Sequence, residues 1–182
     1  MVCHPRLGSD QHDGSVTHPD WREPVRRLRA ATGPATFEQL RIAAAVGCPH
    51  DNEPSGVLTA EIECWLRPML YALRPLPATD RQLDFLEKLG HAHVRPEMHR
   101  RVASAWIDYY LSLLTADALE SLRLKAGDQV HHEHQYVDPS TGEVTDLGGS
   151  VTVSSIGSNG LVYFRGGNGR CGWPTNLRRI NE

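Results

Sequence analysis

The chain has 182 residues, 40% of them apolar and 23% charged, so it can form one medium domain or two small ones with a buried core. Its formal net charge of −3 excludes a global electrostatic attraction to nucleic acid or to an anionic membrane. Any nucleic-acid site must therefore be a local basic patch. Nearly all of the nineteen basic residues are arginines, a bias that more often reflects genome composition than a binding role.

The sequence also indicates where the protein is found. No apolar stretch is long enough to span a bilayer, and no signal-peptide hydrophobic region follows the first residues. We therefore expect a cytoplasmic protein without a membrane partner. The four cysteines show no paired CxxC spacing, so reduced thiols rather than disulfides are expected.

Residues 1–33 are predicted to form a flexible arm with one short basic helix. The first twenty or so are rich in Gly, His, Asp, Pro and Ser and cannot offset the entropy of ordering. A helix over Trp21–Ala31 follows, with Pro24 allowed in its first turn and Gly33 as its end. Its apolar face is expected to pack on the next domain, although an arm that orders on nucleic acid is the alternative. The candidate contacts on the arm are Arg26, Arg27 and Arg29.

One short pattern then occurs twice, in Ala35–Gly47 and in Ala78–Gly90. Each copy has a threonine at the expected N-cap and a glutamine three residues later, which together predict a capping box. The glycine that ends each copy supplies a left-handed C-cap. Each copy therefore predicts one complete helix.

A polar loop and a second, longer helix with an apolar stripe follow each of these helices, and Trp65 and Trp106 are placed at similar points of the two copies. One helical hairpin cannot bury its apolar face alone, whereas two related hairpins can bury theirs against each other. The sequence therefore predicts an all-α domain of two repeated helical hairpins over residues 34–126.

From residue 127 to residue 182 the hydrophobic period changes from helical to alternating. Turn clusters, including an Asn-Gly pair ending at Gly160, separate short strands. The strands are expected over Gly127–Val137, Ser150–Ile156, Leu161–Arg165, Arg170–Trp173 and Leu177–Ile180, with a 3₁₀ turn at Pro174–Asn176 before the last. The fold class is therefore α+β, with the helical domain followed by a five-stranded SH3-like β-barrel.

This C-terminal part resembles the Tudor-like and KOW-like barrels of bacterial nucleic-acid machinery, including the C-terminal domain of UvrD/PcrA-type helicases. The resemblance is carried by Lys125–Val130, Ser158–Phe164 and Trp173–Leu177. It implies a small barrel that serves a nucleic-acid-processing protein. An acidic insertion over Tyr136–Gly148 departs from the family pattern. The repeated helices are similar to SAP-type modules of bacterial and phage DNA-processing proteins.

Charge is divided along the barrel, because five acidic residues precede every arginine: Asp128, Glu133, Asp138, Glu143 and Asp146. Arginines beside exposed aromatic rings can contact phosphates and stack on bases. The alternative is that the aromatic rings are core and that the acids face the arginines across the sheet. The candidate partner-binding residues are Tyr163, Arg165, Arg170, Trp173, Arg178 and Arg179.

The loops after the two capped helices suggest a possible metal site. Cys48, His50, His91 and His93 occupy matching positions in the two copies, and one Cys with three His could bind zinc tetrahedrally if the loops meet. The alternative is that these are solvated loop residues and that the protein has no cofactor. A second histidine-rich segment includes His132 and His134, which are expected on a polar strand face.

No catalytic signature is present: the chain has no nucleophile elbow, phosphate-binding loop or dinucleotide fingerprint. The sequence therefore predicts a non-enzymatic accessory protein that binds DNA, RNA or a nucleic-acid-processing complex. The alternative is a protein–protein adaptor whose barrel grips a peptide or loop. A zinc-dependent hydrolase that uses the histidine-rich loops is the least favoured possibility.

Overall fold

The computed structural model describes residues 16–71, 74–91, 94–137, 141, 143–146, 148–166 and 169–180; residues 1–15 of the predicted arm lie outside them. The chain divides into a β-rich unit, Met1–Leu28 with Leu114–Glu182, and a helical unit, Arg29–Leu113. The division falls within helices α1 (Arg22–Ala31) and α5 (Arg100–Leu122), whereas the sequence suggested boundaries after residues 33 and 126. Within the described ranges, every helix is too short or too polar to cross a membrane.

The capped helices of the helical unit form as predicted. Helix α2 (Phe37–Val46) begins at a capping box of Thr36 and Gln39, and α4 (Asp80–Lys88) begins at one of Thr79 and Gln82. Gly47 has a φ of 69° at the end of α2, and Gly90, with a φ of 80°, follows α4. Both glycines adopt the left-handed backbone that the pattern predicts.

The glutamine of each capping box also connects its helix to the following one. The Gln39 amide donates to the carbonyl oxygen of Ser55 at 3.0 Å and to Thr59 Oγ1 at 2.7 Å, at the start of α3 (Ser55–Tyr71). The Gln82 amide donates in the same way to the carbonyl oxygen of Arg100 at 3.3 Å and to Ser104 Oγ at 2.9 Å, at the start of α5. Ser55 therefore corresponds to Arg100.

This correspondence changes one sequence expectation. Counting from Ser55 and from Arg100, Trp65 corresponds to Tyr110, and Trp106 corresponds to Glu61. The two tryptophans are thus about one helical turn out of register when the helices are aligned at their starts. The small cores do correspond: Ala43, Leu58 and Ile62 cluster in the first half, and Leu86, Ala103 and Ile107 in the second.

The β-rich unit contains an antiparallel sheet, so the α+β class is confirmed. The order of the strands across the sheet is β7 (Cys171–Gly172), β6 (Val162–Phe164), β5 (Gly149–Gly157), β2 (Gln129–His132) and β8 (Leu177–Arg179). A short strand outside this order, β1 (Thr17–His18), also pairs with β5. The sheet is not closed. A 3₁₀ turn over Pro174–Asn176 precedes β8, as the sequence predicts.

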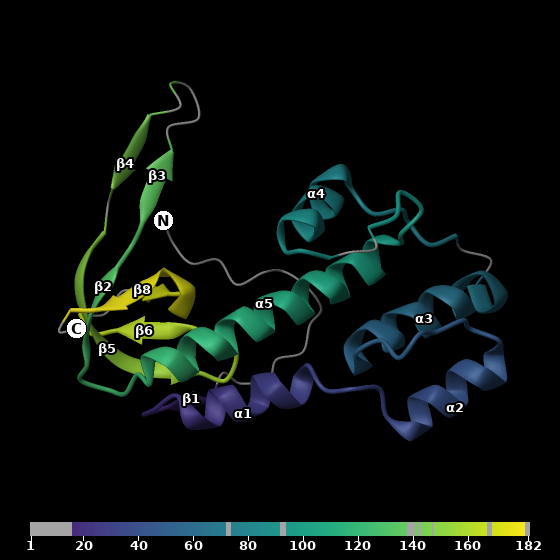
Figure 1. Ribbon diagram of the computed structural model, residues 1–182, viewed down its shortest axis with the longest axis horizontal. Coiled ribbons are helices and arrows are strands. Elements are labelled where there is room, and N and C mark those ends of the chain that lie inside the picture. The colour runs from purple at the N-terminus through teal and green to yellow at the C-terminus, as the bar shows by residue number, and fades with distance from the viewer. Residues whose placement is uncertain are drawn as a thin grey trace. The chain divides into compact units, whose positions relative to one another are not determined.

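Two features of this sheet differ from the expected strands. The expected first strand is two strands, β2 and β3 (Gln135–Val137), and β3 pairs with β4 (Val144–Asp146) in a separate two-stranded ribbon. Figure 1 shows this ribbon extending from the sheet. Strand β1 comes from the segment expected to be a flexible arm, and the amide of Ala126 donates to the carbonyl of Pro19 at 2.7 Å. Backbone pairing therefore orders this part of the arm.

The core of the β-rich unit lies between the sheet and two helices. Val25 and Leu28 of α1 and Leu119 of α5 cluster with the inward-facing strand residues. Helix α1 therefore buries an apolar face, as its spacing predicts, but in the core of the β-rich unit and not on the helical domain that follows it in the chain. The strand residues of the cluster are Val130, Val153, Ile156, Val162, Phe164 and Leu177.

Candidate nucleic-acid interface

Four of the predicted partner-binding residues lie on the hairpin formed by β6 and β7. Tyr163 is half-buried on β6 opposite Cys171, Arg165 follows β6, and Arg170 precedes β7. The amide of Phe164 donates to the carbonyl of Arg170 at 3.0 Å, which holds the two arginine-bearing ends together. Trp173 directly follows β7 and is 45% exposed. Paired strand residues share a side of the sheet, so Tyr163 and Trp173 project away from the side of Val162 and Phe164, whereas Arg170, opposite Phe164, lies on that side.

Arg165 and Arg170 are the exposed charges of this hairpin. Neither has an ion-pair partner in the part of the chain that the structure describes. The Arg165 guanidinium lies beside the turn at Gly127, 3.9 Å from where a Cβ would stand. Two arginines that are not neutralised, together with two partly exposed aromatic rings, are groups that contact phosphates and bases. The four residues share this hairpin but not one side of it, and we call their surface the β6–β7 face.

Arg178 and Arg179 lie on β8, at the other end of the strand order. Arg178 is exposed and pairs with Glu133 at 2.6 Å. Arg179 is held more firmly: its Nε donates to the carbonyl of Leu122 at 2.8 Å, and its Nη2 donates to Asp128 Oδ2 at 3.1 Å. Both guanidinium groups therefore already have intramolecular partners, and that of Arg179 binds the C-terminal end of α5.

The α1 arginines are distributed between the units. Arg26 and Arg27 both donate to the carboxylate of Glu23, at distances of 2.8 to 2.9 Å. Hydrogen bonds from Arg27 and then Arg26 lower the pKa of Glu23, so this carboxylate stays ionised. Arg29 is exposed and belongs to the helical unit. The structure therefore does not join these arginines to the β6–β7 face.

The histidines of β2 are not on a purely polar face. The His132 ring packs against Phe164, with 5.3 Å between centroids, and stacks on His134 at 5.8 Å. Burial, followed by the charges of His134, Arg170 and His131, lowers the pKa of His132. His132 is therefore neutral at pH 7 and adds no charge beside Arg170.

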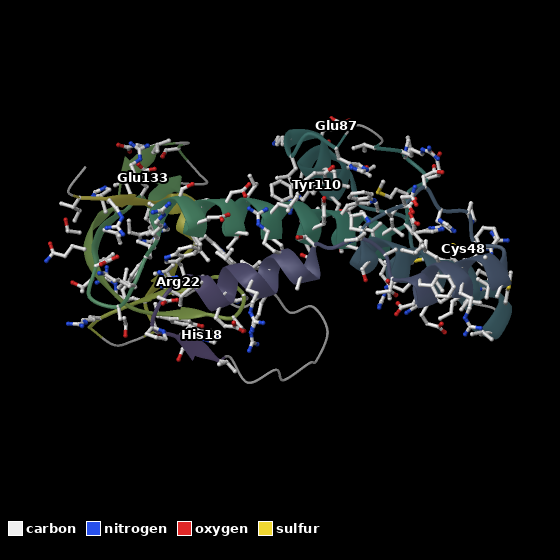
Figure 2. The ribbon with its side chains drawn as sticks, turned by 60° about the horizontal axis from the view of Figure 1, so that its bottom comes forward. His18, Arg22, Cys48, Glu87, Tyr110 and Glu133 are labelled. Carbon is white, nitrogen blue, oxygen red and sulfur yellow. The ribbon has the colours of Figure 1, made fainter. Side chains whose placement is uncertain are left out.

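The residues predicted to bind zinc have separate environments. Cys48 is buried in the first helical core, where burial raises the pKa of its thiol. His91 is also buried; its Nδ1 lies 3.1 Å from the Tyr110 hydroxyl and its ring lies 4.5 Å from that of Trp106. Figure 2 shows Cys48 well apart from Tyr110. His50 Nδ1 is buried and lacks a hydrogen-bond partner, and His93 lies outside the described residues.

Within the described ranges, no group of three or more His, Cys, Asp or Glu side chains is placed so that it could hold a metal ion. Cys48 and His91 belong to the cores of different halves of the helical unit. In both positions the side chain fills space next to the end of a capped helix. The matching positions in the sequence thus reflect matching structural positions.

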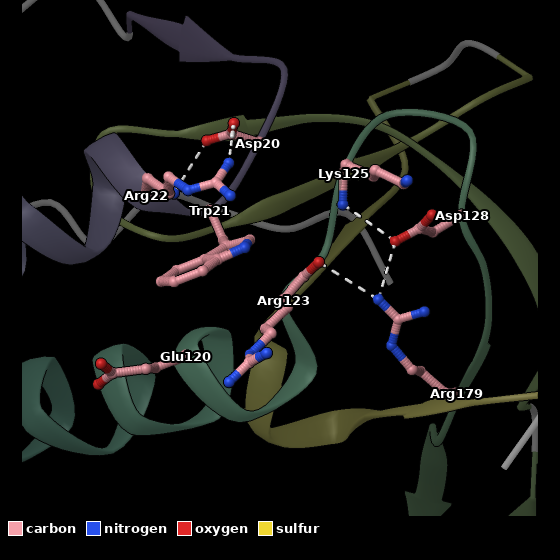
Figure 3. A pocket seen from close by; sticks show the side chains of 8 residues that line it. All are labelled: Asp20, Trp21, Arg22, Glu120, Arg123, Lys125, Asp128 and Arg179. Carbon is pink, nitrogen blue, oxygen red and sulfur yellow. Dashed lines mark hydrogen bonds and ion pairs between the residues drawn. The ribbon is translucent and has the colours of Figure 1, made fainter.

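A pocket of about 510 Å³ is the second candidate site, and Figure 3 shows its lining. All of its lining residues belong to the β-rich unit. An isolated bridge between Asp20 and Lys125, with a bond from the Trp21 amide to the carbonyl of Leu124 at 3.1 Å, places the start of α1 beside the end of α5. The lining residues are Asp20, Trp21, Arg22, Glu120, Arg123, Lys125, Asp128 and Arg179.

Sequence reasoning found only Arg179 among the pocket residues. Trp21 begins the predicted helix, and its ring packs partly against the core. The other residues carry no motif, and the segments that form the pocket are far apart in the chain. No pattern within either segment predicts that they pair.

No protein-family model matches this chain, and no curated protein and no solved structure is significantly similar to it. The resemblance to Tudor-like and KOW-like barrels and to SAP-type helices therefore stays a prediction.

Proposed function

We propose that this protein is a non-enzymatic accessory protein that binds nucleic acid, directly or within a nucleic-acid-processing complex, through the β6–β7 face. One observation carries this proposal. Arg165 and Arg170 are exposed, lack an ion-pair partner among the described residues, and lie on the same hairpin as the partly exposed rings of Tyr163 and Trp173. Arginine binds phosphate oxygens in bidentate fashion, and aromatic rings stack on bases of any sequence.

The contact is a small one. Two arginines release few counterions, so the affinity for a strand is expected to be modest and strongly salt-dependent. The net charge of −3 repels nucleic acid elsewhere on the chain. A role as an accessory module, which adds contacts to those of a larger complex, fits a weak and local site.

The architecture that we propose for this function is an SH3-like small barrel joined to a duplicated helical hairpin. The strand order β7-β6-β5-β2-β8, with a 3₁₀ turn before the last strand, supports the first part. The two capping glutamines, which each bond to the start of the next long helix, support the second. Both parts, like a cytoplasmic location, stay predictions.

The alternative function is a protein–protein adaptor that does not touch nucleic acid. Large apolar side chains of the helical unit favour it, because Phe37 is 82% exposed and Met69 66% exposed. Exposed apolar side chains are typical of protein interaction surfaces when they gather in a patch. The experiment below separates the two functions.

The test is a fluorescence anisotropy titration of single-stranded and duplex DNA and RNA, all with 5′-hydroxyl ends, at several salt concentrations. Wild type is compared with the double variant R165Q/R170Q. Loss of two phosphate contacts is expected to reduce the slope of log affinity against log salt by about 1.4 for a single strand. The affinity itself is expected to fall about tenfold or more.

The matched control is R81Q/R95Q, which removes the same charge from two exposed arginines of the helical unit. It should retain wild-type affinity if the effect is local. Absence of salt-dependent binding in wild type would contradict the proposal and favour the adaptor. Equal losses in the two double variants would show that overall charge, and not the β6–β7 face, governs binding.

A further inference from the structure

The side chain of His132 joins two parts of the β-rich unit that backbone pairing does not join. Strand β2 pairs with β5 and β8, and the hairpin of β6 and β7 lies on the far side of β5 in the strand order. The His132 ring nevertheless packs against the ring of Phe164 on β6, with 5.3 Å between their centroids. His132 therefore connects β2 directly to the hairpin.

This contact is close because Gly172 of β7 leaves room for the imidazole. A Cβ added at Gly172 would lie 2.7 Å from His132 Nε2 and 3.2 Å from Phe164 Cζ. The ring of His134 also stacks on that of His132, with an angle of 16° between the planes. Among the described residues, no hydrogen bond or ion pair holds the His132 imidazole. At this point the hairpin is therefore held to β2 by the packing of a neutral ring.

The surroundings of His132 disfavour a positive charge on its ring. Burial lowers the pKa of His132 below its ordinary value of 6.5, and the charges of His134, Arg170 and His131 lower it further. Arg170 lies opposite Phe164, on the side of the sheet where the His132 ring packs. A protonated His132 would therefore be repelled by the hairpin that it contacts.

The other strands around His132 supply no negative charge to offset this repulsion. Strands β5 and β8 place Gly149 and Leu177 opposite it, and the hairpin residues that it touches are an apolar ring and a glycine. The nearest carboxylate in the sequence, that of Glu133, is already paired with Arg178. A charged imidazole in this position would lose hydration without gaining an anionic partner.

We propose that His132 is a pH-sensitive latch, whose neutral imidazole holds the β6–β7 hairpin against β2 and whose protonation releases the hairpin. Both nitrogens of an imidazolium are donors and need water or an acceptor, which the Phe164 ring does not offer. The charged ring reaches water when it leaves this position. The backbone pairing of β6 with β5 does not involve His132, so the release is local to the hairpin.

The direction of the switch follows from the lowered pKa of His132. The latched state holds the proton less tightly than the released state, so the latch is stable above about pH 6.5 and is lost as the pH falls. If His132 has its ordinary pKa once released, the equilibrium constant for release rises by up to about thirtyfold from about pH 7.5 to about pH 5.

The latch goes beyond the proposed function, because it is a property of the fold. It acts on the hairpin that carries Arg165 and Arg170, so its release moves the candidate binding residues. The measurements below need no nucleic acid. Failure of the latch and failure of the proposed function therefore give different results.

The test is NMR spectroscopy of the full chain from about pH 7.5 to about pH 5. Nuclear Overhauser contacts between the His132 and Phe164 rings report the latch, and the imidazole carbon shifts of His132 report its protonation. We expect these contacts at the higher pH, and we expect them to weaken with the midpoint of the His132 titration, below 6.5. The proposal is overturned if His132 titrates while the contacts persist, or if its midpoint is not below 6.5.

Two variants change the latch in different ways. His132→Phe keeps an aromatic ring that cannot be protonated, so the Phe164 ring resonances should show no transition over this pH range. Gly172→Ala places a methyl group where the imidazole packs, so the midpoint of His132 should rise toward 6.5 as the ring is displaced into water. A transition that persists in His132→Phe overturns the proposal, and so does an unchanged midpoint in Gly172→Ala.

The matched control is His131→Gln, a change at the neighbouring histidine of β2. His131 lies on the other side of the sheet, opposite Ser150 and Arg178. The variant should keep the transition, with a slightly higher midpoint because one repelling charge is gone. Loss of the transition in His131→Gln would assign the change to a group other than His132 and would also overturn the proposal.

Discussion

Arg178 and Arg179 are neighbours on β8 and were both predicted to contact a partner, yet the structure gives them different roles. The Arg179 guanidinium donates to two carbonyl oxygens at the end of α5, those of Leu122 at 2.8 Å and Arg123 at 3.2 Å. It also pairs with Asp128, whose side chain is only 13% exposed. Arg178 makes one ion pair with Glu133, and its own side chain is 76% exposed. Arg179 is therefore expected to stabilise the fold, and Arg178 is not.

The magnitudes follow from the environments. A hydrogen bond to a charged group contributes about 1.5–3 kcal/mol when it is sheltered, and truncation of Arg179 also leaves the Asp128 carboxylate without its cation. We therefore expect R179A to lower the free energy of unfolding of the β-rich unit by about 2–3 kcal/mol. An exposed ion pair contributes about 0–1 kcal/mol, so R178A should cost less than about 1 kcal/mol.

The assay is equilibrium urea unfolding of the full chain, followed through the methyl resonances of Val130 and Val153. Both side chains are fully buried in the core of the β-rich unit, so they report on that unit alone. The two variants remove the same charge from adjacent residues, which makes each a control for the other. Equal destabilisation by R178A and R179A would refute the reasoning, because it would mean that the bonds of Arg179 to α5 contribute nothing.

Two further changes test other parts of the fold. Gly160→Ala should destabilise the β-rich unit by about 2–4 kcal/mol in urea unfolding, because φ is +83° and a Cβ would lie 2.4 Å from Thr115 Cγ2. Gly169→Ala, with a φ of +64° and open space, should cost only about 1 kcal/mol, and equal costs would contradict the packing argument. Burial, with the charges of Glu53 and Asp51 adding to it, raises the pKa of Glu61 to about 7. The folded state therefore holds this proton more tightly than the unfolded state does, and stability falls as the pH rises from about 4.5 to about 7. After allowance for solvent screening of this half-buried group, the fall is about 1–2 kcal/mol. Glu61→Gln should abolish it in unfolding at pH 5 and pH 7.5; an unchanged pH dependence would assign it to other groups.

Local features were the ones that could be predicted. The capping boxes at Thr36 and Thr79, the turn ending at Gly160 and the 3₁₀ turn at Pro174–Asn176 all form where the sequence indicates. Each depends on residues within four positions of one another, so its hydrogen bonds are encoded in a short stretch of chain. The class, α+β, follows from the change in hydrophobic period, and the division between helical and strand residues follows with it.

The partners of each side chain were decided by tertiary structure. Nothing near Arg179 in the sequence indicates that it binds the end of α5, and nothing near Trp21 indicates that it lines a pocket with Arg123 and Lys125. Strand β1 likewise pairs with β5 only because the chain returns to it. By itself the sequence determined the local elements and their caps, whereas the pocket and the choice of which arginines remain unpaired depend on contacts between distant segments. The physical reason is that backbone pairing and ion pairs between such segments form only when the whole unit folds, and no local periodicity records them.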